Sequence, residues 1–531
     1  MRGVLLGHRA KLVFSVALSH IFYKRVGKDM QNRKKFFYNG VIMTLVALLL
    51  RSVAMFFSAY FSRTVGEVGV GLYTVIMTVY SFLLTLATSG ISLTVTRHVA
   101  AALGRGERGE LCKIMRGAFL YSLLFGTLAS LVLFFGADLI ADKILNDGRV
   151  GMSLRVLSFS LLPSALCSAL SGYFVGVKKI ASNSALQLIG GVLRIPITVF
   201  AVSKFAHMGV EYAVFGICLG IFLSELLSFL MIYTVYLVAR ERGGRGAQLG
   251  KVAKTALPLA FSTYVRSALL TLEHVLIPKK LTERGDGRDT ALASYGALHG
   301  MSLPLIMYPM TPLTSFSGLL VPEFAEAEAG GEHSRLSRIC TEAVETTLKY
   351  AVCVAVLIYV FAEELGYTVY SSYEAGRYIA LLAPAVPIMY LDHITDGMLK
   401  GVGEQVYAMW VNITDSLLSV ILVVILIPKM GIVGYGLVII IMEAYNFALS
   451  YMRLKKRIKF SIRPLCAIIL PLLSSLLSAF SVKRAFSVNG ELTSPLWLIL
   501  KIIFAVAVFI ALNTAFSLIK SKRTKITERL R

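Results

Sequence analysis

Two arginines stand inside long apolar segments, each followed by a serine: Arg51-Ser52 in "LLLRSVA" and Arg266-Ser267 in "TYVRSAL". A charge near the middle of a bilayer costs at least about 2.5–3.5 kcal/mol on insertion scales, so an arginine there normally lines a cavity or meets a partner. Three explanations are open. The arginine is a cation in a water-accessible cavity, or it pairs with an acid on another helix, or its side chain reaches the membrane surface because the helix ends elsewhere. The first explanation favours an anionic ligand over an organic cation.

Hydroxyl side chains accompany both arginines. Ser58 lies seven residues after Arg51 and Ser262 lies four residues before Arg266, so each shares a helix face with its arginine. A longer stripe follows at intervals of three or four residues: Thr74, Thr78, Ser81, Thr85, Thr88, Ser92 and Thr96. Such a stripe, with Thr78 and Thr85 near its middle, either meets a hydroxyl-rich ligand such as a sugar, or packs closely with its hydroxyls bonded back to helix carbonyls.

Carboxylates also occur within the apolar segments. They are Glu225, Glu273, Asp392, Asp396, Asp415 and Glu443. Asp392 and Asp396 share a helix face because they are four residues apart. These two could bind a proton or a sodium ion, or could neutralise Arg194 or Arg266. Glu225, Glu273, Asp392, Asp396 and Glu443 are the candidates for ion coupling.

No pattern in the chain is typical of an enzyme. The eight histidines and six cysteines show no HExxH, no CxxC and no other metal-ligand spacing, and neither GxSxG nor a glycine loop with a phosphate-binding lysine occurs. We therefore expect no catalytic residue, no metal site and no cofactor, although transport could be coupled to sodium, protons or the membrane potential.

The composition places these residues in a membrane. Of 531 residues, 56% are hydrophobic and 16% are charged, and the mean hydropathy is +0.73. A bilayer requires about 20 apolar residues per helix, and this length predicts about fourteen transmembrane helices in an all-α integral membrane protein. The expected segments lie near 37–61, 70–96, 115–136, 151–175, 182–204, 210–239, 254–279, 290–320, 340–361, 374–399, 405–427, 432–452, 463–482 and 494–519.

The charge distribution predicts the orientation. Lys and Arg number 54 and Asp and Glu 30, and the basic clusters fall in alternate loops, which favours a cytoplasmic location for both termini. Such clusters also suit anionic lipids. Because they are dispersed and lack a soluble aromatic-bearing domain, we expect no nucleic-acid binding. The basic extension 1–36 is either an interfacial helix, since its apolar run 11–22 is too short to span, or lies upstream of a start at Met30.

An internal repeat predicts two lobes. Besides the matched arginines, "SGYFVGVKK" (171–179) corresponds to "DGMLKGVGE" (396–404), so that Gly172 and Gly176 match Gly397 and Gly401. Six helices per repeat is an even number, so the two lobes run parallel and face each other across a central cavity. The expected parts are an N-lobe at 37–239, a cytoplasmic linker at 240–253, a C-lobe at 254–453, two further helices within 463–519 and a basic cytoplasmic tail at 520–531.

One helix of the second lobe contains Pro304, Pro309 and Pro312. Proline removes a helix hydrogen bond, and broken helices in membranes line cavities or bend moving elements. A proline-kinked structural helix is the simpler alternative.

The segment "RTVGEVGVGLY" (63–73), followed by "SGISLTVTRHVA" (89–100), resembles the stage V sporulation protein B group of the multidrug/oligosaccharidyl-lipid/polysaccharide (MOP) exporter superfamily. The resemblance extends over most of the chain from about residue 35. It differs at Ser58, where the family usually has a second arginine, and at Glu273, where the family tends to have an aspartate.

The resemblance implies a flippase or exporter of the bacterial cytoplasmic membrane that works by alternating access without ATP. Its implied substrate is a polyprenyl-pyrophosphate-linked saccharide or peptidoglycan precursor, for cell-wall, spore-cortex or polysaccharide synthesis. Arg51 and Arg266 would hold the pyrophosphate, to which guanidinium groups bind in pairs of charge-assisted hydrogen bonds. Two alternatives remain: a cation-coupled multidrug exporter of the same superfamily, and a non-transporting membrane scaffold that binds envelope-synthesis proteins.

Overall fold

The computed structural model describes residues 30–239, 246–486 and 495–529, and these residues form helices and connecting turns without any strand. The expected N-terminal interfacial segment lies outside the described residues. All-α structure is the physical consequence of the composition, because a lipid-exposed backbone must satisfy its own hydrogen bonds.

Eleven helices in the described ranges are long and apolar enough to cross a membrane. The fold class is therefore confirmed, but the number fourteen is not. The expected segments 37–61 and 70–96 begin on the two helical parts of α2 (Met30–Thr88), which is broken at Gly66 by a positive φ of 69°. The end of the second segment lies in α3 (Ile91–Gly104), and the two segments count as one apolar stretch, Arg51–Gly104, among the eleven. The segment 254–279 lies in α8 (Leu249–Arg284), and the segment 290–320 is divided into short pieces. Neither of these belongs to the eleven.

The chain forms two compact units, and each is described by itself. Unit 1 contains residues 1–63, 297–415 and 433–531, and unit 2 contains residues 64–296 and 416–432. Each unit groups residues that lie close together in space. The units differ from the lobes expected from the repeat, because the start of α2 belongs to unit 1 and α8 belongs to unit 2. The lobe boundaries remain predictions.

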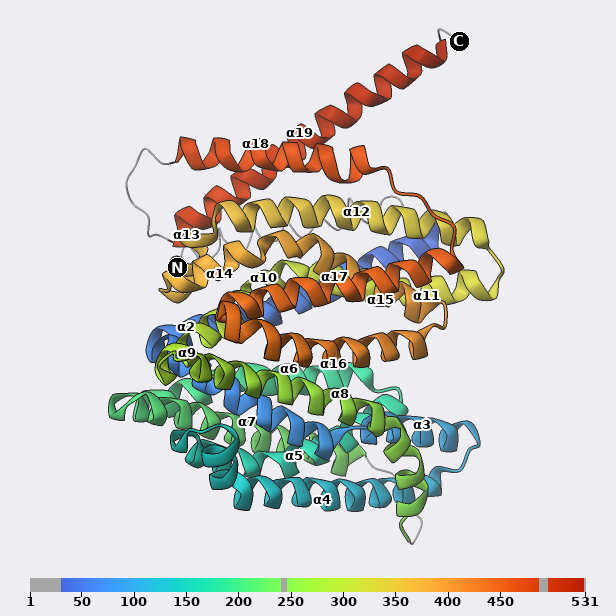
Figure 1. Cartoon of the computed structure of the whole chain (residues 1–531). Coiled ribbons are helices and arrows are strands. Elements are labelled where there is room, and N and C mark those ends of the chain that lie inside the picture. Colours follow the sequence, from blue (N-terminus) through green and yellow to red (C-terminus); the bar gives the residue numbers. More distant parts are fainter. Residues whose placement is uncertain (1–29, 240–245, 487–494, 530–531) are drawn as a thin grey trace. The chain divides into compact units, whose positions relative to one another are not determined.

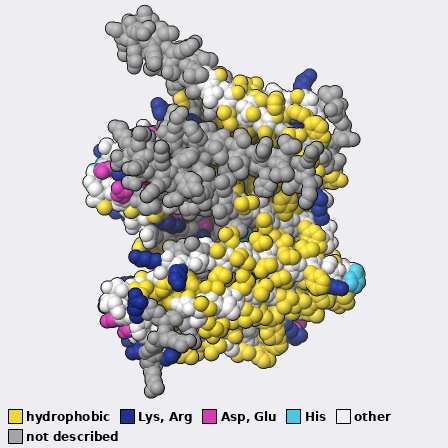
Figure 2. Space-filling model, turned by 180° about the vertical axis from the view of Figure 1, so that it is seen from behind, with side chains coloured by type: hydrophobic (Ala, Val, Ile, Leu, Met, Phe, Trp, Pro, Cys, Tyr) yellow, Lys and Arg dark blue, Asp and Glu magenta, His cyan; other side chains and the backbone are white. Residues whose placement is uncertain are grey.

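Unit 2 is built on a layer of long helices that lie side by side (Figure 1). After the second part of α2, the elements are α3 (Ile91–Gly104), α4 (Arg108–Leu139), α5 (Gly151–Gly176), α6 (Ile180–Phe205), α7 (Val210–Ala239), α8 and α9 (Arg288–Tyr295). Short turns of helix, η1 (Ile140–Ile144), η2 (Gly148–Val150) and η3 (Ala206–Met208), connect them. Apolar side chains of α3, α4, α5, α7 and α8 form its main core. Figure 2 shows hydrophobic side chains spread over an outer face of this unit, as expected of a surface in contact with lipid.

Unit 1 contains the broken helix and the C-terminal helices. Its elements after the start of α2 are η4 (Gly296–Ser302), α10 (Leu303–Met307), η5 (Tyr308–Met310), α11 (Thr311–Ala329), α12 (His333–Val360), α13 (Ala362–Tyr370), α14 (Tyr373–Leu382), η6 (Ala383–Ala385), α15 (Val386–Gly401), α16 (Gln405–Met430), α17 (Ile432–Arg457), η7 (Leu465–Ile469), α18 (Leu470–Ala485) and α19 (Pro495–Arg529). Residues 416–430 of α16 belong to unit 2. The helices α18 and α19 pack beside α12 and α13 around a second apolar core (Figure 1).

The repeat glycines have equivalent packing roles in the two units. A Cβ atom on Gly172 of α5 would lie 2.5 Å from the Ser92 carbonyl oxygen of α3, and a Cβ on Gly397 of α15 would lie 2.1 Å from the Ser317 Oγ of α11. Glycine is needed at Gly172 because the backbone of α3 occupies the space of a side chain, whereas at Gly397 the Ser317 hydroxyl would have to turn away. The internal repeat is therefore visible as a matched helix contact.

Candidate functional site

Arg51 is an exposed cation on α2 in unit 1. Its guanidinium makes no ion pair or hydrogen bond to any other described residue, although its charge acts on the neighbouring Tyr390. Of the three explanations from the sequence, an ion pair with an acid on another helix has no support in the described part of unit 1. The arginine is left free to meet water or an anion.

The residue after Arg51 fixes α2 to the broken helix. The Ser52 and Tyr308 hydroxyl groups lie 2.7 Å apart, and Tyr308 begins the short turn η5 between α10 and α11. The interruption of this helix at its prolines is confirmed, since π-helical and 3-10 turns separate its α-helical parts.

Two buried tyrosines satisfy backbone oxygens at the break. The Tyr390 hydroxyl donates to the Ile306 carbonyl at 2.8 Å, and the Tyr350 hydroxyl donates to the Pro309 carbonyl at 2.5 Å. The rings of Tyr350 and Tyr390 are stacked, with centroids 6.1 Å apart. Within a membrane, a broken helix is stable only when other groups replace the missing helix hydrogen bonds, so the two tyrosines hold the break in its shape.

Arg266 is the corresponding exposed arginine of α8 in unit 2. It too makes no ion pair or hydrogen bond to a described residue. The Tyr264 hydroxyl, two residues earlier, donates to the Leu86 carbonyl at 3.2 Å, and this contact holds α8 against the end of α2. The side chain of Ser262 lies outside the described residues, whereas Ser58 in unit 1 is half-buried.

The threonines of the expected stripe donate to carbonyls four residues earlier in their own helix. Thr78 donates to the Thr74 carbonyl at 2.9 Å, and Thr85 donates to the Ser81 carbonyl at 2.7 Å. Thr74, Thr88 and Thr96 do the same. The hydroxyl hydrogens of these threonines are thus already used in hydrogen bonds within the helix, as the packing interpretation expects. Their oxygens can still accept hydrogen bonds from a ligand.

The acids of unit 2 have protein partners. Glu225 of α7 forms an ion pair with Arg194 of α6 and accepts a hydrogen bond from Ser164 at 3.0 Å. The partner of Arg194 within unit 2 is therefore Glu225. Glu273 of α8 is buried, with 6% of its surface exposed.

The acids of unit 1 differ in their partners. Asp396 pairs with Lys400 one turn later, at 2.6 Å. The Oδ1 atom of Asp392, by contrast, is buried and has no hydrogen-bond partner among the described residues. Asp415 of α16 and Glu443 of α17 lie within electrostatic range of Asp392. No group of three metal-ligating side chains occurs in the described ranges.

Charged residues in two loops of unit 2 form a network that the sequence did not reveal. The Asp147 carboxylate, between α4 and α5, accepts hydrogen bonds from Arg149 and, at 3.0 Å, from Arg288 at the start of α9. Arg149 also reaches Asp289 at 2.7 Å. Burial favours a higher pKa for Asp147, but the hydrogen bonds of Arg149 and the charge of Arg288 outweigh it, so that the pKa lies below its usual range.

Sequence reasoning also missed the tyrosines of the broken helix. The three prolines indicated that backbone oxygens would need new donors, but Tyr350 and Tyr390 are distant in sequence and no spacing rule connects them to the break.

The comparisons with known proteins identify a family and several relatives of the whole chain. The family model described as "Polysaccharide biosynthesis protein" matches residues 36–328. Stage V sporulation protein B of Bacillus subtilis (strain 168) is 25% identical over 77% of this chain and 81% of the relative. Lipid II flippase MurJ of the same strain is 23% identical over 73% of this chain and 77% of the relative.

Two solved structures have a similar fold. A structure of lipid II flippase MurJ in an inward closed conformation matches with a TM-score of 0.71 and 14% identity, covering 90% of this chain and 98% of the other. A multidrug resistance MATE family transporter of the MOP superfamily, in an inward-facing conformation, matches with a TM-score of 0.62 and 16% identity, covering 78% and 98%. Two of these proteins are named for movement of a substrate across a membrane: the lipid II flippase MurJ and the multidrug resistance MATE family transporter.

Proposed function

Since the chain belongs to the polysaccharide biosynthesis protein family and is a multi-pass membrane transporter, we propose that it flips a polyprenyl-pyrophosphate-linked saccharide or peptidoglycan precursor across the bacterial cytoplasmic membrane. The observation that carries this proposal is the pair of exposed arginines, Arg51 and Arg266, neither of which has a protein counter-ion among the described residues.

Guanidinium groups without a counter-ion among the described residues favour an anionic substrate. Arg51 lies at the start of an apolar stretch of α2, whereas Arg266 lies in the less apolar helix α8, which also carries Glu273. An unneutralised charge is costly inside a membrane. Water in a cavity reduces that cost, and a pyrophosphate reduces it further because its oxygens accept paired hydrogen bonds from a planar guanidinium. Arg194, which also belongs to an apolar helix, has its own carboxylate. Arg51 and Arg266 are therefore available for a ligand.

The remaining candidate residues would bind the other parts of the substrate, the sugars and the polyprenyl tail. Ser58, Thr78 and Thr85, and Ser262 by its position in the sequence, would accept hydrogen bonds from sugar hydroxyls. The helices α18 and α19 would offer a surface for the polyprenyl tail. We place both termini in the cytoplasm because of the basic loops, and anionic lipids and envelope-synthesis proteins are the further partners that we expect.

A cation-coupled multidrug exporter is the second candidate. The observation that favours it is Asp392, whose Oδ1 atom is buried without a hydrogen-bond partner in the described part of the chain. In a flippase the same acid would serve coupling to sodium, protons or the membrane potential. In a drug exporter it would be part of the principal binding site.

A flipping assay tests the proposal. Purified protein in vesicles is given a fluorescent lipid-linked saccharide, and the accessibility of the label reports its translocation. We expect R51A and R266A each to reduce flipping about ten-fold or more, since hydrogen bonds between charged groups contribute roughly 1.5–3 kcal/mol. Lysine at either position should restore part of the rate, because it keeps the charge but loses the planar fork.

R194A is the matched control, because Arg194 also lies within an apolar helix but forms an ion pair with Glu225. It should lower the thermal unfolding temperature in detergent, whereas R51A and R266A should leave it nearly unchanged. Normal flipping by a stably folded R51A/R266A double variant would contradict a pyrophosphate-linked substrate. Absence of transport of any lipid or cation by the wild-type protein would favour the scaffold alternative.

A further inference from the structure

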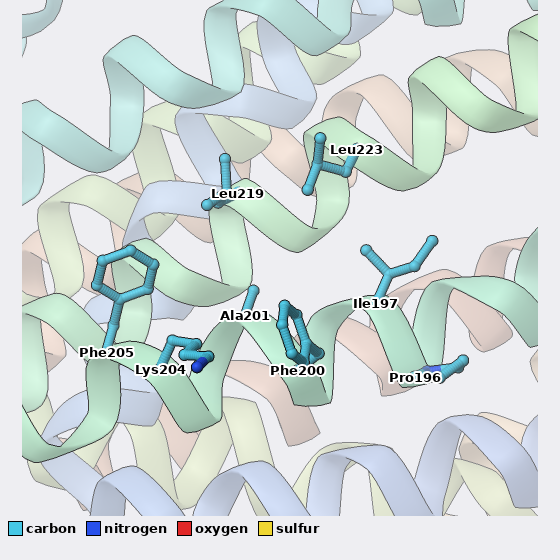
Figure 3. A pocket seen from close by; sticks show the side chains of 8 residues that line it. All are labelled: Pro196, Ile197, Phe200, Ala201, Lys204, Phe205, Leu219 and Leu223. Atoms are coloured by element: carbon cyan, nitrogen blue, oxygen red, sulfur yellow. The ribbon is translucent and has the colours of Figure 1, made fainter.

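The helices α6 and α7 of unit 2 form a groove that is lined by none of the candidate site residues discussed above. Its volume is about 780 Å³. In Figure 3, the side chains of α6 form one wall and Leu219 and Leu223 of α7 form the other. The α6 residues that line the groove are Pro196, Ile197, Phe200, Ala201, Lys204 and Phe205.

The walls of the groove are suited to hydrocarbon. Every lining residue except Lys204 is apolar. Phe200 is 65% exposed and Leu223 is 41% exposed, so the groove opens on a surface that a membrane covers with lipid chains. The apolar walls offer water no hydrogen-bond partners, so hydrocarbon is the more favourable occupant of the groove.

Lys204 supplies a single positive charge at one end of the groove. Its ammonium lies 5.7 Å from the centre of the Phe200 ring, and no carboxylate pairs with it in the described ranges. The lysine belongs to the last turn of α6, at the end of this apolar helix. A lysine at this depth keeps its stem in the apolar region and its charge among headgroups.

The lysine alone has a simpler explanation, since a cation near a helix C-terminus interacts favourably with the helix dipole. That explanation does not account for the groove beside it. The combination of an apolar channel with one cation at its end is complementary to a molecule that has the same two parts, a hydrocarbon chain and a phosphate.

We propose that this groove is a binding site for an anionic phospholipid of the surrounding bilayer, with one acyl chain between α6 and α7 and the phosphate beside Lys204. The site goes beyond the proposed transport function. It gives the transporter a dependence on lipid charge that is separate from Arg51 and Arg266.

Native mass spectrometry of delipidated protein titrated with phosphatidylglycerol or phosphatidylcholine tests this inference. For the wild type we expect tighter binding of one phosphatidylglycerol molecule. K204A should weaken phosphatidylglycerol binding about five-fold, the size expected for one basic residue near an anionic headgroup, and should leave phosphatidylcholine binding unchanged. K143A is the matched control, because Lys143 is an exposed lysine of η1 in the same unit, away from the groove. It should behave as wild type.

Filling the groove tests the position of the chain. L219W should reduce the binding of both lipids while Lys204 is still present, and L223W, at a more exposed position of the same wall, serves if L219W does not fold. Equal affinities for the two lipids in the wild type, or no effect of K204A, would overturn the proposal. Displacement of phosphatidylglycerol by an equal concentration of polyprenyl phosphate would also overturn it, because the groove would then be a substrate site.

Discussion

The Ser52 and Tyr308 hydroxyl groups, separated by 2.7 Å, connect the helix that carries Arg51 to the break between α10 and α11. The connection is local to unit 1 and places one candidate ligand-binding residue next to the broken helix. The position of Arg51 therefore depends on the shape of the break, which the hydrogen bonds of Tyr350 and Tyr390 also stabilise.

We expect Y308F to disturb Arg51 without unfolding the protein. The substitution removes one hydrogen bond between partly buried groups, which costs about 0.5–1.5 kcal/mol of stability. In a double-mutant cycle with S52A, the coupling free energy measured by thermal unfolding in detergent should be of the same size.

The flipping assay gives the second measurement on Y308F. If the hydrogen bond positions Arg51, the apparent affinity for the lipid-linked substrate should fall in Y308F, and Y308F/S52A should be no worse than either single variant. Independent, additive effects of the two substitutions would show that the contact is incidental.

The sequence was informative about elements whose formation depends on local composition. The segment 210–239 was expected as a helix and is α7 at the same residues. The matched glycines Gly172 and Gly397 were found by comparing the two halves of the chain, and both mark a close helix contact. Apolar length and internal similarity are properties of the chain itself, so they can be read before the fold is known.

Partnerships between distant helices were less predictable. The Asp396–Lys400 pair follows from four-residue spacing within one helix, but the pairing of Arg194 with Glu225 is set by the packing of α6 against α7. Such outcomes depend on which helices meet, and the sequence of one helix does not contain that information.

Glu404 should make stability sensitive to acid. This carboxylate is 7% exposed and accepts hydrogen bonds from Arg453, the nearest at 2.9 Å, and from Arg457 at 2.6 Å. The hydrogen bonds from Arg453 contribute most to holding its pKa below the usual range. A depressed folded-state pKa gives a contribution to stability that is complete above the unfolded pKa, about 4.3, and is lost as the pH falls through the folded value.

The expected result is a wild-type unfolding temperature that falls more steeply below about pH 4.3 than that of E404Q, which should be less stable at neutral pH and flatter in acid. Thermal unfolding in detergent between neutral and acidic pH measures both slopes. E328Q is the control, because Glu328 is an exposed acid of α11. Parallel curves for wild type and E404Q would rule out this role for Glu404.

Asp147 should contribute to the stability of unit 2 through its loop network. D147N keeps the size of the side chain but removes the charge that Arg149 and Arg288 share. We expect the free energy of unfolding to fall by about 1.5–3 kcal/mol at most, the size typical of hydrogen bonds to charged groups. Solvent reduces this effect because the side chains of Arg149 and Arg288 are 33% and 34% exposed. D142N, at an exposed neighbouring position, should change the unfolding free energy little. Equal losses in the two variants would mean that the network has no special contribution.

Alanine should have opposite effects at two helical glycines of unit 2. A Cβ on Gly71 of α2 would lie 1.9 Å from the Leu292 carbonyl oxygen of α9, whereas a Cβ on Gly191 of α6 would meet nothing within 4 Å. G71A forces two backbones apart and should cost about 1–3 kcal/mol or more. G191A should be neutral or stabilising by up to about 1 kcal/mol, because alanine favours a helix more than glycine does. Unfolding temperatures in detergent compare the pair, and a G71A variant as stable as G191A would contradict the close approach of α2 and α9.

Asp392 and Asp396 should differ in their importance for ion coupling, although they are one turn apart on α15. Asp396 has its charge partnered by Lys400 at 2.6 Å. Asp392 has a buried Oδ1 atom without a hydrogen-bond partner among the described residues, and Asp415 and Glu443 lie within electrostatic range. A carboxylate in that setting gains most from a bound proton or sodium ion.

We therefore expect D392N to remove the dependence of flipping on an imposed sodium or proton gradient, and D396N to keep it. The measurement is flipping in vesicles with each gradient applied separately, with E443Q as a third variant that should resemble D392N. If D396N lost the gradient dependence while D392N retained it, the coupling site would have to be sought around Lys400 instead.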